Sequence, residues 1–542
     1  IDTVYQNYNI DKIYLDAYKQ VHTPSGDKYP DVNNDIDKNI MNGTLLINYV
    51  GHGGEYGLAA EGVLTFYEIG KYDNFYNLPI FVTATCEFSR YDNPELESGG
   101  EKILLHPKGG GIAMFTTTRI AFAHSNEIVN RNLLKTAFTE NLTEKIRFGD
   151  IIKSSKNMCS PGVYKENFTL LGDPALTLAI PQYDVKTESV TLDSSNILGD
   201  TIFNNNLITV KGFISDRDGN KQDWFNGKIY PRVYDKPIMV TTLANDPSQS
   251  YPAAFKLQKN LIFQGNSTVK DGEFEFSFFA PRDITFGDGL GKIMYYAKSE
   301  FFDARGITDS LLLKNNGIND NSDITGPDIN IFMEDLTFQE GGETSSNPLM
   351  IAFLHDTSGI NSVGLGIGHE LVCELDEEHN VPYWLNTYFV QDADKYSSGK
   401  ISYQFFGLNY GVHKLRLSAW DFLNNNSDKE ITFNVKSPTD VELGGIYNYP
   451  NPVTDGTTFY IDRNMSTDIM SIKISIFDIT GKLCVELNQN ILPGTYKPVE
   501  IHWNGMNSSG EPLSKGFYTY KVTLSDAAGR LRQKSDKMVI IK

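Results

Sequence analysis

Three short runs of apolar residues stand out in the first part of the chain. They occupy residues 44–50, 79–85 and 111–117 and are rich in Ile, Val, Phe and Thr. Runs of this length with few polar interruptions are typical of strands that are buried on both faces of a parallel sheet. Residues 1–183 are therefore predicted to form an α/β domain around such a sheet.

Helical spacing of apolar residues occurs between or after these runs. It is visible at residues 101–105 and again at residues 126–140. Ser125 is a suitable N-cap for the second helix, because its hydroxyl could accept a hydrogen bond from an amide of the first turn. Strands that alternate with helices complete the pattern of an α/β sheet.

After residue 183 the pattern changes to short strands with alternating polar and apolar positions. The clearest are residues 207–215, 273–279 and 293–297, and turns rich in Asn, Asp, Gly and Ser separate them. Polar stretches at 313–328 and 437–445 have the composition of linkers. The remainder is therefore predicted to form a β-sandwich at 184–325, an Ig-like β-sandwich at 326–437 and a third β-sandwich at 438–542.

Composition and charge narrow the functional classes. Of the 542 residues, 40% are hydrophobic and 12% aromatic, which is enough to fill several cores. The formal net charge of −20 argues against nucleic acid as a partner and against a generic anionic membrane surface, because both demand a positive face. The chain begins at Ile1, with neither an initiator Met nor a signal peptide, so we expect it to be the C-terminal portion of a longer precursor.

The cysteines show no pattern of a metal site or of disulfides. The four are Cys86, Cys159, Cys373 and Cys484, which are widely spaced and form no CxxC pair. No cofactor and no metal ion are predicted. A lone cysteine is most often a small buried apolar residue, so a chemical role for any of them needs specific evidence.

Cys86 has such evidence, together with His52. His52 follows the first predicted strand and stands between Gly51 and Gly53, and Cys86 follows the next strand. The carboxyl ends of neighbouring parallel strands meet at one edge of the sheet, where ligands bind. An imidazole at that edge is a suitable base to activate a thiol nucleophile. The alternative is that His52 only ends a strand and Cys86 only packs.

The glycines beside His52 favour the catalytic interpretation. Residues without a Cβ let the backbone and a substrate approach closely. The backbone amides of Gly53 and Cys86 could then both point at an oxyanion that develops on a substrate carbonyl, and so stabilise the transition state.

Several motifs occur in an order that resembles the gingipain-like cysteine peptidases, whose catalytic core has a caspase-like α/β fold. The motifs are residues 47–54 (INYVGHGG), Cys86, residues 110–113 (GGIA) and residues 171–176 (LGDPAL). Residues 85–92 (TCEFSRYD) and 116–119 (TTTR) are similar to the sortases of type IX secretion within this family. The resemblance extends over nearly the whole chain.

The resemblance implies a role for each matching residue. Cys86 would be the nucleophile, His52 the base, and the amides of Gly53 and Cys86 the oxyanion hole. Thr117, Thr118 and Phe122, at and after the third strand end, would line the pocket for the residue before the scissile bond.

Three residues near the pair depart from the gingipain pattern. They are Gly54, Glu55 and Glu87, and they argue against carrying over an arginine-specific pocket. Glu55 and Glu87 are instead candidates for the substrate pocket. The acid that orients the imidazole in gingipains would fall at or before Ile1. Glu55 and Glu87 are candidates for this role only because they lie near His52 and Cys86 in sequence.

Two arginines lie close to the predicted site in sequence. Arg90 and Arg119 could each bind a carboxylate or a phosphate through two hydrogen bonds. The simpler interpretation is that they form ion pairs with nearby acids such as Asp92 or Glu101.

The C-terminal unit carries a second set of family-like motifs. They are residues 447–452 (YNYPNP), 503–505 (WNG) and 516–522 (GFYTYKV). Physically they fit alternating strands joined by Asn-Gly and Ser-Gly turns. They resemble the sorting-signal domains of type IX secretion.

These observations lead to three hypotheses. The preferred one is a sortase on the outer-membrane surface that cleaves C-terminal signal domains from cargo proteins through a Cys86 thioester and transfers the cargo to an amine of anionic lipopolysaccharide. Its partners would be such cargo proteins, lipopolysaccharide and a PorV-like outer-membrane β-barrel. The alternatives are a secreted gingipain-like endopeptidase that uses the same pair, and a non-catalytic surface adhesin.

Overall fold

The computed structural model describes residues 4–5, 7–138, 145–192, 201–246, 248, 250–315, 323–365, 368–376, 382–436, 443–463, 470–491, 499–525 and 530–541. The chain divides into two compact units. The first comprises residues 1–280 and 284–318, and the second comprises residues 281–283 and 319–542.

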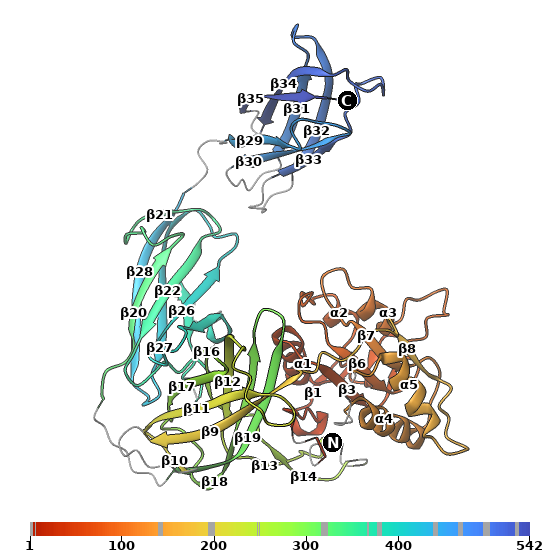
Figure 1. Cartoon of the computed structure of the whole chain (residues 1–542), viewed down its shortest axis with the longest axis vertical. Coiled ribbons are helices and arrows are strands. Elements are labelled where there is room, and N and C mark those ends of the chain that lie inside the picture. The colour runs from red at the N-terminus through yellow and green to blue at the C-terminus, as the bar shows by residue number, and fades with distance from the viewer. Residues whose placement is uncertain are drawn as a thin grey trace. The chain divides into compact units, whose positions relative to one another are not determined.

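A four-stranded sheet forms the centre of the first domain. Its strands lie in the order β3 (Leu46–Val50), β6 (Ile80–Ala84), β7 (Ala113–Thr117) and β8 (Phe168–Leu171). The first three are parallel, and β8 is antiparallel to β7. The three apolar runs of the sequence are these parallel strands, so the predicted α/β sheet is confirmed (Figure 1).

Helices cover both faces of this sheet. They are α1 (Pro30–Asn42), α2 (Phe66–Ile69), α3 (Gly99–Leu104), α4 (Ala123–Ala137) and α5 (Phe148–Asn157), with a short 3-10 helix η1 (Leu15–Ala17). Phe81 of β6 belongs to a core with apolar residues of α1, α2 and α3. Its neighbour Val82 belongs to a second core with apolar residues of α4 and α5. Because successive strand residues point to opposite faces, the domain has three layers, with the sheet in the middle.

Two small hairpins complete the domain. One pairs β1 (Val21–Thr23) with β2 (Gly26–Lys28), and the other pairs β4 (Gly53–Gly54) with β5 (Gly57–Leu58). The second hairpin directly follows His52.

The helix starts differ from the sequence-based expectation. α3 begins at Gly99, because Ser98 and Glu101 form a capping box at its N-terminus. α4 begins at Ala123, with Phe122 at the N-cap and no capping side chain. Ser125 therefore lies inside the helix, where its hydroxyl accepts a hydrogen bond from the Tyr164 amide at 3.2 Å, and the prediction that it caps the helix is wrong.

The second domain of the first unit is built on one large sheet. Its strands are β9 (Tyr183–Leu192), β10 (Thr201–Phe203), β11 (Leu207–Ser215), β12 (Gly227–Tyr234), β15 (Leu261–Gln264), β16 (Ser267–Lys270), β17 (Glu273–Phe279), β18 (Gly287–Lys298) and β19 (Asp303–Asn315). A separate hairpin pairs β13 (Ile238–Thr241) with β14 (Ala254–Leu257). β19 pairs with β9 at Ala304–Tyr183 and Arg305–Asp184, so the sheet closes on itself instead of splitting into two sheets.

The second unit begins with a two-sheet sandwich. One sheet has the order β20 (Asp328–Met333), β22 (Leu349–His355), β26 (Ser398–Gln404) and β25 (Phe389–Gln391). The other has the order β21 (Glu343–Thr344), β28 (Asn426–Val435), β27 (Gly411–Trp420), β23 (Val372–Leu375) and β24 (Tyr383–Trp384), with η2 (Asn386–Tyr388) before β25. Residues of both sheets share one apolar core, which is the packing of an Ig-like sandwich.

The C-terminal part is another sandwich with its own core. A sheet of β29 (Leu443–Tyr449), β30 (Thr457–Arg463) and β33 (Val499–Trp503) faces a sheet of β32 (Leu483–Ile491), β31 (Met470–Phe477), β34 (Gly516–Ser525) and β35 (Leu531–Ile540). The chain is thus an α/β domain followed by β domains, as the sequence predicted.

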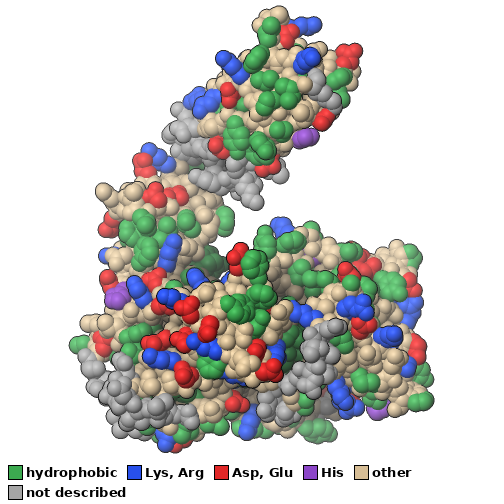
Figure 2. Space-filling model, viewed as in Figure 1, with side chains coloured by type: hydrophobic (Ala, Val, Ile, Leu, Met, Phe, Trp, Pro, Cys, Tyr) green, Lys and Arg blue, Asp and Glu red, His purple; other side chains and the backbone are tan. Residues whose placement is uncertain are grey.

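The surface carries charges of both signs. On the face that Figure 2 shows, acidic and basic side chains are interspersed and do not form one large basic area. Among the helices that the structure describes, none has both the length and the apolar character needed to cross a membrane.

Candidate active site

The ends of β3 and β6 bring His52 and Cys86 to the same place on the sheet edge. The two strands are parallel, and their register pairs Val50 with Ala84. The Gly51 amide continues this ladder with a hydrogen bond to the Ala84 carbonyl at 3.5 Å. His52 and Cys86 both lie two residues beyond the Val50–Ala84 pair, and neighbouring strands are about 4.8 Å apart. His52 and Cys86 therefore follow the ends of two adjacent parallel strands at the same distance along the chain.

The backbone of His52 is fixed from two sides. Its carbonyl accepts a hydrogen bond from the Tyr49 hydroxyl at 2.6 Å and from the Ala59 amide at 2.8 Å. The Tyr49 side chain reaches this carbonyl across Gly51, where a Cβ would lie only 2.7 Å from the Tyr49 hydroxyl oxygen. A side chain at residue 51 would therefore displace the Tyr49 hydroxyl from the His52 carbonyl. His52 itself is exposed to solvent.

The His52 loop and the Cys86 loop touch at Gly53. A Cβ on Gly53 would lie 2.5 Å from Thr85 Oγ1 and 3.3 Å from Thr85 Cγ2. Thr85 is fully buried, and its carbonyl accepts hydrogen bonds from Thr117 Oγ1 at 2.8 Å and Asn126 Nδ2 at 3.2 Å. The residue before Cys86 is thus held by β7 and α4, and the residue after His52 packs directly on it.

The thiol of Cys86 is half-buried and is not part of a disulfide. Its Sγ lies 3.4 Å from both the carbonyl oxygen and the amide nitrogen of Ala121, in the loop after β7. Glu87 follows with a φ of +50°, which turns the chain sharply away from the strand. Ala121 and Asn126 are site residues that sequence reasoning missed, because neither an alanine backbone nor a helical Asn carries a motif.

The predicted pocket residues after β7 fall in different environments. Thr117 is fully buried, and its hydroxyl donates a hydrogen bond to the Thr85 carbonyl. The Thr118 hydroxyl donates to the Asn167 carbonyl at 3.3 Å. Phe122 is 60% exposed and packs its ring against Tyr164, with 5.1 Å between the ring centroids. Phe122 is therefore the one of these three with an aromatic surface open to a ligand.

The two predicted glutamates lie on either side of Arg90. Arg90 Nε is 3.6 Å from Glu55 Oε1, and its Nη1 is 3.4 Å from Glu87 Oε1. Glu55 belongs to the turn between β4 and β5, whereas Glu87 and Arg90 belong to the loop after Cys86. Both carboxylates are therefore neutralised in part by one guanidinium.

Arg119 forms a separate ion pair with Asp92. The guanidinium contacts both carboxylate oxygens, with Nη1 at 3.0 Å from Oδ1 and Nη2 bonded to Oδ2. These hydrogen bonds hold the pKa of the Asp92 carboxyl below its usual value. The Arg119 carbonyl also accepts a hydrogen bond from the Glu87 amide. This bond connects the loop after β7 to the loop that begins with Cys86.

The other thiols lack such surroundings. Cys159 is 8% exposed and Cys373 is fully buried. Burial raises the pKa of the Cys373 thiol to about 12, and burial also raises the pKa of Cys484.

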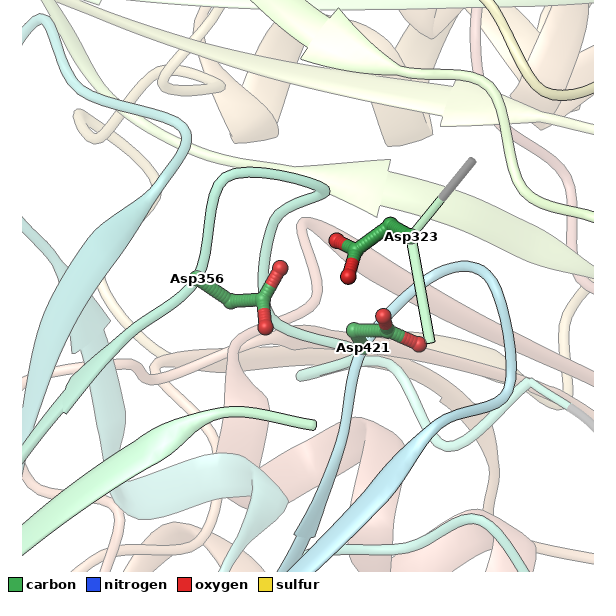
Figure 3. Close-up of side chains that lie close together, drawn as sticks. All are labelled: Asp323, Asp356 and Asp421. Atoms are coloured by element: carbon green, nitrogen blue, oxygen red, sulfur yellow. The ribbon is translucent and has the colours of Figure 1, made fainter. Parts of the chain in front are cut away.

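Within the described part of the chain, one group of three aspartates in the Ig-like sandwich could hold a metal ion. Asp323, Asp356 and Asp421 each offer a carboxylate oxygen within 4.8 Å of the others, and they come from loops beside β20, β22 and β27 (Figure 3). Oxygen ligands of this kind suit Ca²⁺. Burial, together with the nearby carboxylates, raises the pKa of Asp356 to about 7, and burial raises that of Asp421. This group belongs to a different domain from His52 and Cys86.

Comparison with known proteins yields one family. Residues 1–179 match Peptidase family C25. No curated protein matches the chain significantly.

Solved structures include similar chains. The dimeric latent PorU from Porphyromonas gingivalis is 26% identical over 80% of this chain and 41% of the PorU chain, with a TM-score of 0.35. The Arg-specific cysteine proteinase gingipain R is 15% identical over 52% of this chain and 56% of its own, with a TM-score of 0.25. The present chain thus spans about two fifths of the length of the PorU chain.

Proposed function

Because residues 1–179 match peptidase family C25, we propose that the chain is a PorU-like cysteine peptidase that acts as a surface sortase of type IX secretion. Its substrates are cargo proteins with C-terminal sorting domains, and it cleaves the peptide bond before that domain. The observation that supports the proposal is the parallel register of β3 and β6, which pairs Val50 with Ala84, and His52 and Cys86 each follow this pair by two residues.

The first half-reaction forms a thioester. His52 takes the proton from the Cys86 thiol, and the thiolate attacks the carbonyl carbon of the scissile bond. The amides of Gly53 and Cys86 donate hydrogen bonds to the oxyanion that develops on the carbonyl oxygen. Collapse of this intermediate breaks the C–N bond, and His52 returns the proton to the amine of the released sorting domain. The cargo remains bound to Cys86 as a thioester.

The second half-reaction decides between sortase and protease. An amine of lipopolysaccharide attacks the thioester carbon, loses a proton to His52 and leaves the cargo bound through a new amide, while Cys86 regains its proton. Water in the same position gives a free carboxylate, which is the outcome for a gingipain-like endopeptidase. The exposure of His52 to solvent is compatible with either acceptor.

The products of one incubation distinguish these reactions. A reporter protein that carries the C-terminal sorting domain of a cargo protein is incubated with the chain and with a biotinylated primary amine. Mass spectrometry of the released reporter shows an amide to the amine if the chain is a sortase and a carboxylate if it is an endopeptidase. Cys86→Ala should release no reporter, whereas Cys484→Ala should behave like the wild type.

His52→Ala provides an independent check of the pair. Nucleophile and base act as a unit, so the Cys86→Ala/His52→Ala double variant should be no slower than Cys86→Ala alone. Release of reporter by Cys86→Ala at the wild-type rate would show that the proposed chemistry is wrong. An intact reporter with the wild-type chain would favour the non-catalytic adhesin.

A further inference from the structure

A salt bridge joins the two loops that carry the proposed catalytic residues. Glu55 lies at the tip of the β4–β5 hairpin, whose base is His52, and the Ala59 amide closes this hairpin on the His52 carbonyl. Arg90 lies in the loop that begins with Cys86. Arg90 Nε approaches Glu55 Oε1 to 3.6 Å and so connects the two loops on the solvent side of the sheet edge.

Glu55 is held firmly in this position. Its side chain is only 18% exposed, and Oε1 accepts a hydrogen bond from Asn93 Nδ2 at 3.0 Å. Its backbone carbonyl accepts the amide of Gly99 at 2.7 Å, at the start of α3. The hairpin tip is therefore anchored, and movement of the hairpin would break several contacts together.

Arg90 compensates two carboxylates at once. Its Nη1 lies 3.4 Å from Glu87 Oε1, next to the nucleophile, while its Nε faces Glu55. The Nε atom is buried and donates no hydrogen bond, so its interaction with Glu55 is electrostatic. Without the guanidinium, two negative charges from adjacent loops would lie near one another without a cation between them, and their repulsion would push the loops apart.

We propose that Arg90, through Glu55, is a positioning residue that sets the distance between His52 and Cys86. The inference rests on the proposed function, because it concerns the same pair. The contact of Gly53 with Thr85 shows how closely the two loops pack at this point. Catalytic groups lose on the order of 100-fold in rate when they are displaced by about 1 Å, so a small opening of the loops is enough to matter.

The test compares Arg90→Gln, Glu55→Gln and their double variant with Arg131→Gln in the full-length chain. Arg131 forms an exposed ion pair with Glu127 on α4 and serves as the matched control. We expect Arg90→Gln and Glu55→Gln each to lower kcat per titrated Cys86 by about 10- to 100-fold, with KM changed less than about threefold. The double variant should be no more than about threefold slower than the worse single variant, because both remove one interaction.

Structural and positioning roles give different results in this design. A residue needed only for stability would lower the amount of folded protein but leave kcat per titrated thiol unchanged. The Arg90–Glu55 pair is partly exposed, and we expect the melting temperature to fall by less than about 4 °C. Arg131→Gln should change kcat less than about threefold, because its exposed ion pair with Glu127 lies on α4 and joins neither loop.

Two outcomes would overturn the inference. One is a kcat within threefold of the wild type for both Arg90→Gln and Glu55→Gln, while Cys86→Ala is inactive; the dyad would then stand and the positioning role would be wrong. The other is a loss in Glu87→Gln as large as that in Arg90→Gln with none in Glu55→Gln, which would assign the effect to the nucleophile loop alone. Activity in Cys86→Ala would instead refute the proposed function.

Discussion

Replacing Gly53 by alanine should disable the site without unfolding the domain. The new Cβ would lie 2.5 Å from Thr85 Oγ1, 3.3 Å from Thr85 Cγ2 and 3.3 Å from Leu58 Cδ2. Thr85 is fully buried, so its side chain has little free space into which it could rotate. The strain must therefore be relieved by moving the His52 loop away from the Cys86 loop by several tenths of an ångström or more.

The magnitude follows from two known costs. Overpacking of a tight site destabilises a protein by about 1–3 kcal/mol, which a folded domain tolerates. A displacement approaching 1 Å between catalytic groups costs on the order of 100-fold in rate, and Gly53 also supplies one of the proposed oxyanion donors. We expect kcat to fall by about 10²-fold in Gly53→Ala, with a much smaller loss of folded protein.

Gly54→Ala is the matched control for this prediction. A Cβ at Gly54 would meet no atom within 4 Å, so the neighbouring glycine has space for a methyl group. The assay is release of the sorting-domain reporter per titrated thiol, alongside thermal unfolding of each variant. Removing the obstructing groups by a second change, Thr85→Ala, should restore part of the activity of Gly53→Ala. The reasoning is refuted if Gly53→Ala and Gly54→Ala differ by less than twofold in kcat.

Three further predictions concern other parts of the chain. Iodoacetamide should modify Cys86 at least about 10-fold faster than Cys159 and Cys373, which are buried, and peptide mapping that finds either of these two modified first would contradict the site. In metal-free buffer the Ig-like sandwich should lose stability as the pH rises from about 4 to about 7, because folded Asp356 keeps its proton up to about pH 7 while the unfolded carboxyl has released it. Asp356 alone should contribute at most about 1.4 kcal/mol per pH unit to this slope in denaturant titrations, and the slope should be reduced in Asp356→Asn. We propose that residues 438–542, which have their own core, dock the chain to a PorV-like outer-membrane barrel; their deletion should leave the Cys86 chemistry intact but release the chain from the outer membrane, and a truncated chain that still fractionates there would count against this docking.

The strands could be predicted from sequence to within a few residues where hydrophobic patterning determines them. The expected strands at 207–215 and 273–279 coincide with β11 and β17, and the three apolar runs coincide with β3, β6 and β7. Closure of the large sheet could not be foreseen, because it depends on the pairing of Tyr183 and Asp184 with residues more than 100 positions away. Local patterning specifies which residues form strands, but it does not specify which distant strand each one meets.

The helix starts show a limit of a different kind. Ser125 has the right residue type and position for an N-cap, yet its hydroxyl accepts the Tyr164 amide from a distant loop. Ser98 and Glu101, at the spacing of a capping box, give the actual start of α3. A single polar residue is thus a weaker signal than two residues whose hydrogen bonds are reciprocal.

The same reasoning explains which parts of the site the sequence revealed. His52 and Cys86 could be paired because each directly follows a strand, and the parallel register transmits that position across the sheet. Proximity in sequence identifies the partners of the two arginines only in part, since Arg119 pairs with Asp92 and Arg90 with Glu87, whereas Glu101 caps α3.

The second acid that Arg90 contacts, Glu55, lies on the opposite loop and is brought near by the hairpin that follows His52. The candidate catalytic residues could therefore be identified from the strand ends in the sequence, whereas the geometry of the site depends on contacts between loops. For that reason, substitutions at Gly53, Arg90 and Glu55 test the arrangement of the site more sharply than substitution of the catalytic pair itself.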